Sequence, residues 1–127
     1  FISEKYVPYS AQRMGLYKRI ACLETREDKD DIIDELIDRY GDIPKSVMGL
    51  IDIALIRNKA ISMGIYEIKQ NDNSILLYID SIKNEQVGVL ISKLRGQAML
   101  SATQKPYIAV RYKEKIDPIN SLKEIFS

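Results

Sequence analysis

Apolar side chains in the first half of the chain recur every three to four residues, the spacing of one face of a helix. This pattern predicts three helices, over residues 10–23, 25–41 and 44–63. Thr25 and Asp28 have the spacing of a capping box, which would begin the second helix. Gly41 suits the left-handed backbone that closes a helix, and Pro44 suits the first turn of the next one. These signals indicate where the second helix begins and ends.

Each predicted helix is expected to bury one apolar face. The residues expected on these faces are Met14, Tyr17, Ile20 and Ala21 in the first helix, Ile33, Leu36, Ile37 and Tyr40 in the second, and Val47, Leu50, Ile51, Ile53, Ala54, Leu55 and Ile61 in the third. The third helix is apolar over more than half of its circumference, so we expect it to be central. Ser10 is the expected N-cap of the first helix, and Cys22 is expected to be a small core residue. The residues before Ser10 are expected to be extended and to dock Ile2, Tyr6 and Val7 on the core.

After Gly64 the apolar pattern changes from a helical period to alternation, which is typical of strands. It predicts strands over residues 65–69, 75–79, 98–103 and 107–112, a helix from Glu85 to Arg95, and a short last helix after Asp117-Pro118. The order of elements predicts an α+β fold. An N-terminal three-helix segment is followed by a ββαββα segment with a small, mostly antiparallel sheet, in a single domain of residues 1–127.

The amino-acid composition limits which kinds of site this chain can contain. Its 127 residues are enough for one domain with one core, and 46% of them are hydrophobic. The chain has one cysteine and no histidine, which excludes an intrachain disulfide, histidine-dependent nucleophile systems and His-ligated metal sites. It has no apolar run of membrane-spanning length and does not begin with Met, so we expect a cytoplasmic fragment of a longer protein.

No pattern in the sequence predicts a catalytic, cofactor or metal site. The six glycines are scattered, and no Gly-x-x-x-x-Gly-Lys phosphate loop occurs. Asp28, Asp30, Asp31 and Asp34 are dense, but a helix directs them outward over its surface rather than toward one ion. We therefore expect a domain that is not an enzyme and that binds no cofactor or metal.

The second predicted helix carries a strongly acidic ridge. Residues 27–42 hold eight Asp and Glu against Lys29 and Arg39, a local balance of −6. Asp31, Glu35, Asp38 and Asp42 are spaced so that they follow one line along a helix, with Arg39 at its flank. Such a ridge is either a solvated face or a surface for a protein partner, and it would repel a nucleic-acid backbone.

The first helix offers a different possibility. Arg13, Lys18 and Arg19 make it basic, and from Gly64 onward nine Lys and Arg stand against seven Asp and Glu. The alternative function is therefore a small DNA-binding module that uses the first helix and the C-terminal half. A solvated face explains the same residues.

Two segments carry a resemblance to a known family. The segment 13–21, Arg-Met-Gly-Leu-Tyr-Lys-Arg-Ile-Ala, resembles the Arg-Leu-x-x-Tyr-Lys-Arg-Ile-Ala segment of the C-terminal domain of bacterial transcription-repair coupling factors, the Mfd family. The segment 35–44 resembles the Glu-Leu-x-Asp-Arg-Phe-Gly-x-x-Pro signature of that domain, with Tyr40 in place of Phe. The pattern continues through Leu50, Ile53, Ala54, Arg57, Ala60, Gly64 and Ile65.

The resemblance implies a non-catalytic regulatory domain of an ATP-driven, double-stranded DNA translocase. That parent would release stalled RNA polymerase and recruit the excision-repair protein UvrA. The domain would pack on the UvrB-like N-terminal module of the same chain, mask UvrA binding and restrain the motor. Glu35, Asp38 and Arg39 would form this contact, with Asp31 and Asp42 as further contacts.

Overall fold

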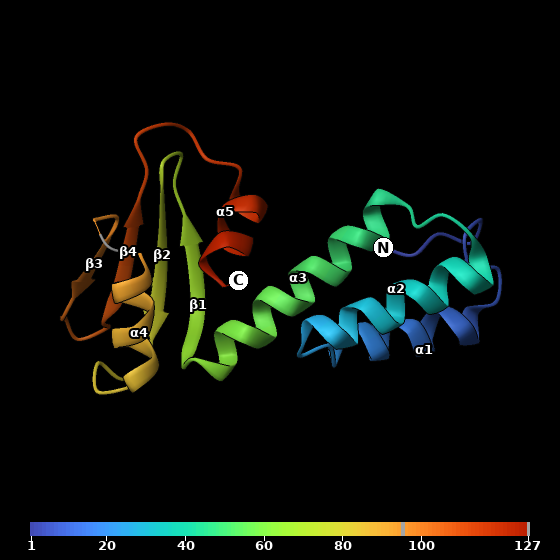
Figure 1. Ribbon diagram of the computed structural model, residues 1–127, viewed down its shortest axis with the longest axis horizontal. Helices are drawn as coiled ribbons and strands as arrows, with labels where there is room; N and C mark the ends of the chain where they lie inside the picture. Colours follow the sequence, from blue (N-terminus) through green and yellow to red (C-terminus); the bar gives the residue numbers. More distant parts are fainter. Residues whose placement is uncertain (95, 127) are drawn as a thin grey trace. The chain divides into compact units, whose positions relative to one another are not determined.

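The computed structural model describes residues 1–94 and 96–126 of the chain, with five helices and four strands among them (Figure 1). Their bounds are α1 Ser10–Ala21, α2 Arg26–Tyr40, α3 Lys45–Ser62, β1 Ile65–Gln70, β2 Ser74–Ile79, α4 Glu85–Lys93, β3 Ala98–Ser101, β4 Tyr107–Arg111 and α5 Pro118–Ile125. The predicted α+β class and the order of its elements are confirmed. Most bounds differ from the predicted ones by a residue or two, and the predicted helix end at Arg95 lies outside the described residues.

The chain divides into two compact units, residues 1–58 and residues 59–127. Buried apolar side chains form two clusters, in place of the one core expected from chain length. The cluster of unit 1 comprises Ile2, Val7, Leu16, Ile20, Leu23, Ile32, Leu36, Val47, Ile51 and Ala54. The burial of Ile2 and Val7, and the packing of Tyr6 beside them, confirm that the N-terminal segment docks on this core. The segment is not extended throughout, because the N–H of Val7 donates to the carbonyl of Ser3 at 3.1 Å in a turn.

The buried faces of α1 and α2 agree with the predicted ones only in part. Ile20 and Leu36 are buried as predicted, and Ile33 and Tyr40 are partly buried against the core. Both helices contain pairs of adjacent apolar residues. The first residue of each pair is buried in the core, namely Leu16, Ile20, Ile32 and Leu36. Met14 and Tyr17 are exposed, and Ala21 is exposed as well. Ile37 keeps 49% of its surface accessible. A helical period fits either residue of such a pair, so the choice is made by the neighbouring helices.

Three further details of unit 1 correct the predictions. Ser10 is the first residue of α1 rather than its N-cap, which is Tyr9 without a side-chain hydrogen bond. Cys22 is exposed, because it follows the end of α1 and is not on the inner side of that helix. On α3, Ile53 and Ile61 are exposed, since the buried positions are offset from them. The apolar surface of α3 is therefore only partly covered.

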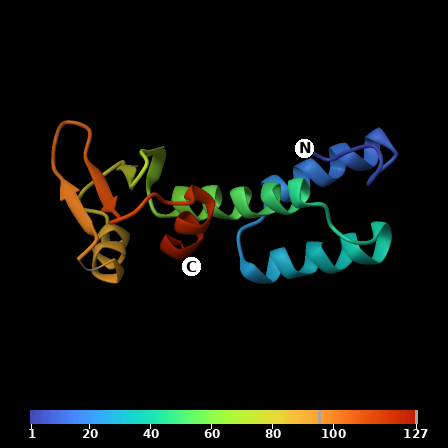
Figure 2. The same ribbon diagram turned by 90° about the horizontal axis from the view of Figure 1, so that it is seen from above.

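Unit 2 is built on a four-stranded antiparallel sheet with strand order β1-β2-β4-β3. The predicted hairpin between β1 and β2 is confirmed, and its turn is closed by the backbone N–H of Asn71, which donates to the carbonyl of Ser74 at 2.9 Å. Helices α4 and α5 lie on one side of the sheet (Figure 2). The cluster on that side includes Ala60, Met63, Ile65, Ile75, Leu77, Ile79, Val87, Leu90, Ile108, Val110 and Ile125.

Close contacts connect the residues that follow α3 with those that precede α4. Gly64 has a φ of +78°, and a Cβ added there would lie 2.5 Å from the carboxylate of Asp80, so only glycine fits. The side chain of Asn84 donates to the carbonyl of Met63 at 3.1 Å and accepts from the N–H of Gln86 at 2.9 Å. The side-chain amide of Asn84 therefore caps α4 and also binds the backbone just after α3.

Candidate functional site

Helix α2 begins at a capping box. The hydroxyl of Thr25 accepts a hydrogen bond from the N–H of Asp28 at 3.0 Å. The carboxylate of Asp28 accepts in return from the N–H groups of Glu24 and Thr25, at 3.1 and 3.2 Å. These backbone hydrogen bonds hold the pKa of the Asp28 carboxyl below its ordinary value. The predicted capping box is confirmed, and it fixes the start of the helix that carries the acidic ridge.

The other end of α2 is anchored by tyrosines. Gly41 closes the helix with a φ of +84°, and its carbonyl accepts from the hydroxyl of Tyr6 at 3.1 Å. The rings of Tyr6 and Tyr40 lie 5.7 Å apart, and the hydroxyl of Tyr40 donates to Gln12 on α1 at 3.0 Å. Burial, and then the nearby charge of Asp42, raise the pKa of Tyr6. Both ends of α2 are therefore fixed by side-chain contacts within unit 1.

An ion-pair cluster joins α2 to α1. The Glu35 carboxylate lies between two guanidinium groups, that of Arg19 on α1 and that of Arg39 one turn along α2. Arg19 donates directly to Oε2 of Glu35, and Nη1 of Arg39 lies 3.8 Å from the same oxygen. We call Arg19, Glu35 and Arg39 the Glu35 cluster. The three side chains keep 47%, 37% and 57% of their surface accessible, so solvent screens the cluster.

The exposed surface of α2 carries five acids outside the Glu35 cluster. Glu27, Asp30, Asp31, Asp34 and Asp38 are exposed, and we call them the acidic face. None of them forms an ion pair with another residue that the structure describes. The exposed side chain of Ile37 lies beside this face, one helical turn from Asp34. The acidic face thus combines unpaired charge with one accessible apolar side chain.

Two of the three cations of α2, Lys29 and Arg39, form ion pairs with residues outside the acidic face. Nζ of Lys29 lies 3.0 Å from Asp52 on α3, and the Asp52 side chain is only 9% accessible. Arg39 is held toward Glu35 instead. The third cation, Arg26, is exposed and forms no ion pair with another described residue. The acidic face therefore keeps its negative charge exposed.

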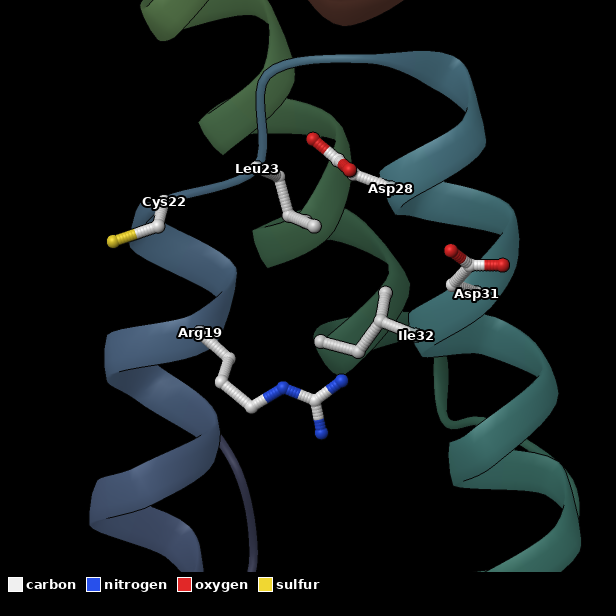
Figure 3. A pocket seen from close by; sticks show the side chains of 6 residues that line it. All are labelled: Arg19, Cys22, Leu23, Asp28, Asp31 and Ile32. Carbon is white, nitrogen blue, oxygen red and sulfur yellow. The ribbon is translucent and has the colours of Figure 1, made fainter.

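A pocket of about 290 Å³ lies between the end of α1 and the start of α2 (Figure 3). Arg19, Cys22, Leu23, Asp28, Asp31 and Ile32 line it. The guanidinium of Arg19 points across the pocket toward α2, whereas the sulfur of Cys22 points away. Asp28 is already engaged in the capping box. Within residues 1–94 and 96–126, no group of His, Cys, Asp and Glu could hold a metal ion.

The sequence profile of the TRCF domain family matches residues 1–90, which is more than half of the chain. The chain belongs to the TRCF domain family. Its sequence is 35% identical over 96 residues to the transcription-repair-coupling factor of Escherichia coli strain K12, which covers 76% of this chain and 8% of that protein. It is 31% identical over 106 residues to the corresponding protein of Rickettsia bellii, covering 84% of this chain and 9% of that protein.

The fold of this TRCF domain also matches a solved structure, a crystal structure of the C-terminal domain of a transcription-repair coupling factor. The TM-score is 0.80 at 18% identity, and the match covers 99% of this chain and 81% of that one. This likeness establishes the fold. The chain spans less than a tenth of the length of the two relatives named above. The family predicted from the segments 13–21 and 35–44 is thereby confirmed.

The predicted site residues lie in three different settings. Glu35 and Arg39 contact each other in the Glu35 cluster, and Arg19 was not predicted to join them because its partner is 16 residues away on another helix. Asp38 and Asp31 are on the acidic face. Asp42 is not on the ridge, because α2 ends at Tyr40 and the backbone changes direction at Gly41. The ridge is therefore shorter than predicted.

The basic residues of α1 are largely used inside unit 1. Arg13 donates to the carbonyls of Val7 and Pro8 at 2.8 and 3.0 Å, and its side chain is only 18% accessible. Arg19 belongs to the Glu35 cluster. Lys18 is exposed and has no ion-pair partner among the described residues. This arrangement does not favour α1 as a surface for DNA. No described helix is both long and apolar enough to cross a membrane.

The capping box gives a first prediction. Thr25→Ala removes the hydroxyl that accepts from Asp28, so it should lower the free energy of unfolding by about 1 kcal/mol. Urea denaturation followed by circular dichroism measures this change. Thr25→Ser keeps the hydroxyl and should retain most of the stability. An equal loss in both variants would show that the cap does not stabilise α2.

A second prediction concerns the carboxylate of Asp28 and pH. Its pKa is lower in the folded chain than the ordinary value of 3.8, so ionised Asp28 stabilises the fold above that pH. This contribution is lost as the pH falls through the folded-state pKa. The difference in melting temperature between the native chain and Asp28→Asn should therefore be largest near neutral pH and shrink in acid. A difference that stays constant from neutral to strongly acidic pH would contradict the assignment.

A third prediction separates the Glu35 cluster from the acidic face. Glu35→Gln should destabilise the chain by about 0.2–1 kcal/mol, because it breaks the exposed pair between α1 and α2. Asp38→Asn should leave stability unchanged or raise it slightly, because an acid near the C-terminus of a helix opposes the dipole. Urea denaturation of the two variants provides a matched comparison. Equal destabilisation by both would show that Asp38 is also structural.

Proposed function

We propose that this TRCF domain is a non-catalytic regulatory domain that docks on the UvrB-like N-terminal module of its parent protein. The docking surface is the acidic face, which includes Asp38, together with Ile37 and Arg39 at its flanks. In this position it masks the surface that binds UvrA and restrains a DNA translocase that acts on stalled RNA polymerase in the cytoplasm. The observation that carries the proposal is the exposed acidic face, whose carboxylates have no ion-pair partner among the described residues.

The charge pattern of unit 1 supports a protein partner over a nucleic acid. Five exposed carboxylates on one helix face repel phosphate and attract a basic protein surface. Ile37 adds an exposed apolar side chain beside these charges. A largely polar surface of this kind is common in contacts between domains of one chain. The family membership supports this choice of parent, and the resemblance of segment 35–44 supports this choice of partner module.

A contact between two domains of one chain is weak enough to open, as a regulatory switch requires. Contacts between domains of one chain bury about 600–1,500 Å² and are polar enough to open. Each exposed ion pair contributes only about 0.2–1 kcal/mol. A few of them together reach about 1–3 kcal/mol, which is the usual coupling between two sites. The acidic face can therefore hold the parent in a restrained state that UvrA binding or the motor is able to release.

The fourth prediction is made for the full-length protein that contains this domain. Asp38→Ala combined with Arg39→Ala removes two charges of the docking surface and leaves Glu35 paired with Arg19. UvrA binding and basal ATP hydrolysis should both rise by about 2- to 30-fold, the equivalent of two exposed ion pairs. Glu114→Ala combined with Lys115→Ala changes the same number of charges at exposed positions of unit 2, and should change neither activity.

Thermal melting of the 127-residue chain tests whether the double variant is folded. The proposal requires a folded domain together with a derepressed parent. A folded domain in a parent that stays as restrained as before would show that the acidic face is only solvated. ATP hydrolysis by the chain alone would contradict its assignment as non-catalytic.

The alternative function, a DNA-binding module built on α1, has less support. Arg13 and Arg19 would have to leave their carbonyl and carboxylate partners before they could contact a phosphate. The acidic face on the neighbouring helix would oppose the approach of the duplex.

A further inference from the structure

The sheet of unit 2 has a second face that is not part of the core. Side chains alternate between the two faces of a strand, and the core takes Ile75, Leu77 and Ile79 of β2 with Ile108 and Val110 of β4. The core-facing side is the one covered by α4 and α5 (Figure 2). The residues between them, including Leu76, Tyr78 and Tyr107, belong to neither hydrophobic cluster. We call this second side of the sheet, over the residues that the structure describes, the open face.

The strand register fixes which side chains are neighbours on the open face. Glu67, Tyr78, Tyr107 and Ser101 follow one another across β1, β2, β4 and β3. Lys69, Leu76, Ala109 and Met99 form the next such row, and Ser74 and Arg111 are paired beyond it. The open face therefore has an aromatic row, an apolar row and cations at two of its edges. It is not the polar, alternating surface of a sheet that only faces water.

Three tyrosines lie side by side in this pattern. The ring centroids of Tyr66 and Tyr78 are 6.4 Å apart, and those of Tyr78 and Tyr107 are 5.4 Å apart. Tyr66 reaches this face because the register of β1 is irregular between Ile65 and Glu67. It keeps 58% of its surface accessible. We call Tyr66, Tyr78 and Tyr107 the tyrosine row, which crosses β1, β2 and β4.

Positive charge accompanies the tyrosine row. Nζ of Lys69 lies 5.3 Å from the ring centroid of Tyr78, and Arg111 is exposed on the same face. Glu67 is the acid that the register places on this face. The sequence of unit 2 holds ten Lys and Arg against seven Asp and Glu, whereas unit 1 holds nine against eleven. The balance is thus +3 for the unit with the open face and −2 for the unit with the acidic face.

We propose that the open face binds single-stranded nucleic acid, with bases stacked on the tyrosine row and phosphates near Lys69 and Arg111. Aromatic side chains on an exposed antiparallel sheet are suited to unpaired bases, because every base offers a π-face for stacking. The flanking cations complement a phosphate backbone and would oppose a basic protein segment. A duplex hides its base faces, so it cannot use the tyrosines in this way. This inference does not depend on the proposed docking of the acidic face.

The fifth prediction uses the 127-residue chain and a fluorescently labelled strand of about 12 thymidines, a length within the range of single-strand sites. Fluorescence anisotropy at about 50 mM salt should show binding that weakens as salt rises and that is tighter than binding to the matched duplex. Tyr66→Ala should weaken the binding of the single strand by about 5-fold or more, because one stacking surface is lost. Lys69→Gln should reduce the salt dependence, and Glu67→Gln should strengthen binding by removing a like charge.

Matched variants make the outcome decisive. Tyr9→Ala removes an exposed tyrosine of unit 1 and should have no effect. Tyr66→Leu keeps an apolar side chain without a ring and should weaken binding as Tyr66→Ala does, with circular dichroism showing that both remain folded. Absence of binding overturns the proposal and leaves the open face as a protein contact or a solvated surface. Equal binding of duplex, or equal affinities of the Tyr66 and Tyr9 variants, overturns it as well.

Discussion

Unit 1 depends on the burial of a small set of aliphatic side chains by three helices. Leu36 and Ile51 are fully buried, and Ile32 and Val47 are nearly so. Each such side chain stabilises the fold by about 1.5–3 kcal/mol, whereas an exposed ion pair contributes about 0.2–1 kcal/mol. The aliphatic contacts therefore decide whether the unit folds. The charges on the outside of α2 are free to serve contacts with other molecules, since the fold does not require them.

Element types and their order followed from periodicity, caps and glycines, but the buried face of each helix was predicted only in part. Where two apolar residues are adjacent, as at Ile32-Ile33 and Leu36-Ile37, a helical period fits both choices. The packing of α1 and α3 resolves this ambiguity, and that packing is a long-range property. Ile37 was consequently expected in the core, whereas it is exposed beside the acidic face.

Ion pairs between different helices could not be predicted from the sequence either. The local spacing of Glu35 and Arg39 indicated their proximity, because they are one helical turn apart. The pairs of Glu35 with Arg19 and of Lys29 with Asp52 join different helices, so no local pattern predicts them. The tyrosine row has the same origin. Its members are close in space because of strand order and register, which the sequence left open.

The junction at Gly64 determines where this chain can accept extra length. Because the amide of Asn84 bonds to both Met63 and Gln86, a residue inserted into the segment 80–84 would separate the end of α3 from the start of α4. The segment 102–105, by contrast, is an exposed connection between β3 and β4. Exposed loop tips of this kind are where proteins tolerate insertions. Variation in length, in nature or by grafting of a tag, is therefore better accommodated between β3 and β4 than before α4.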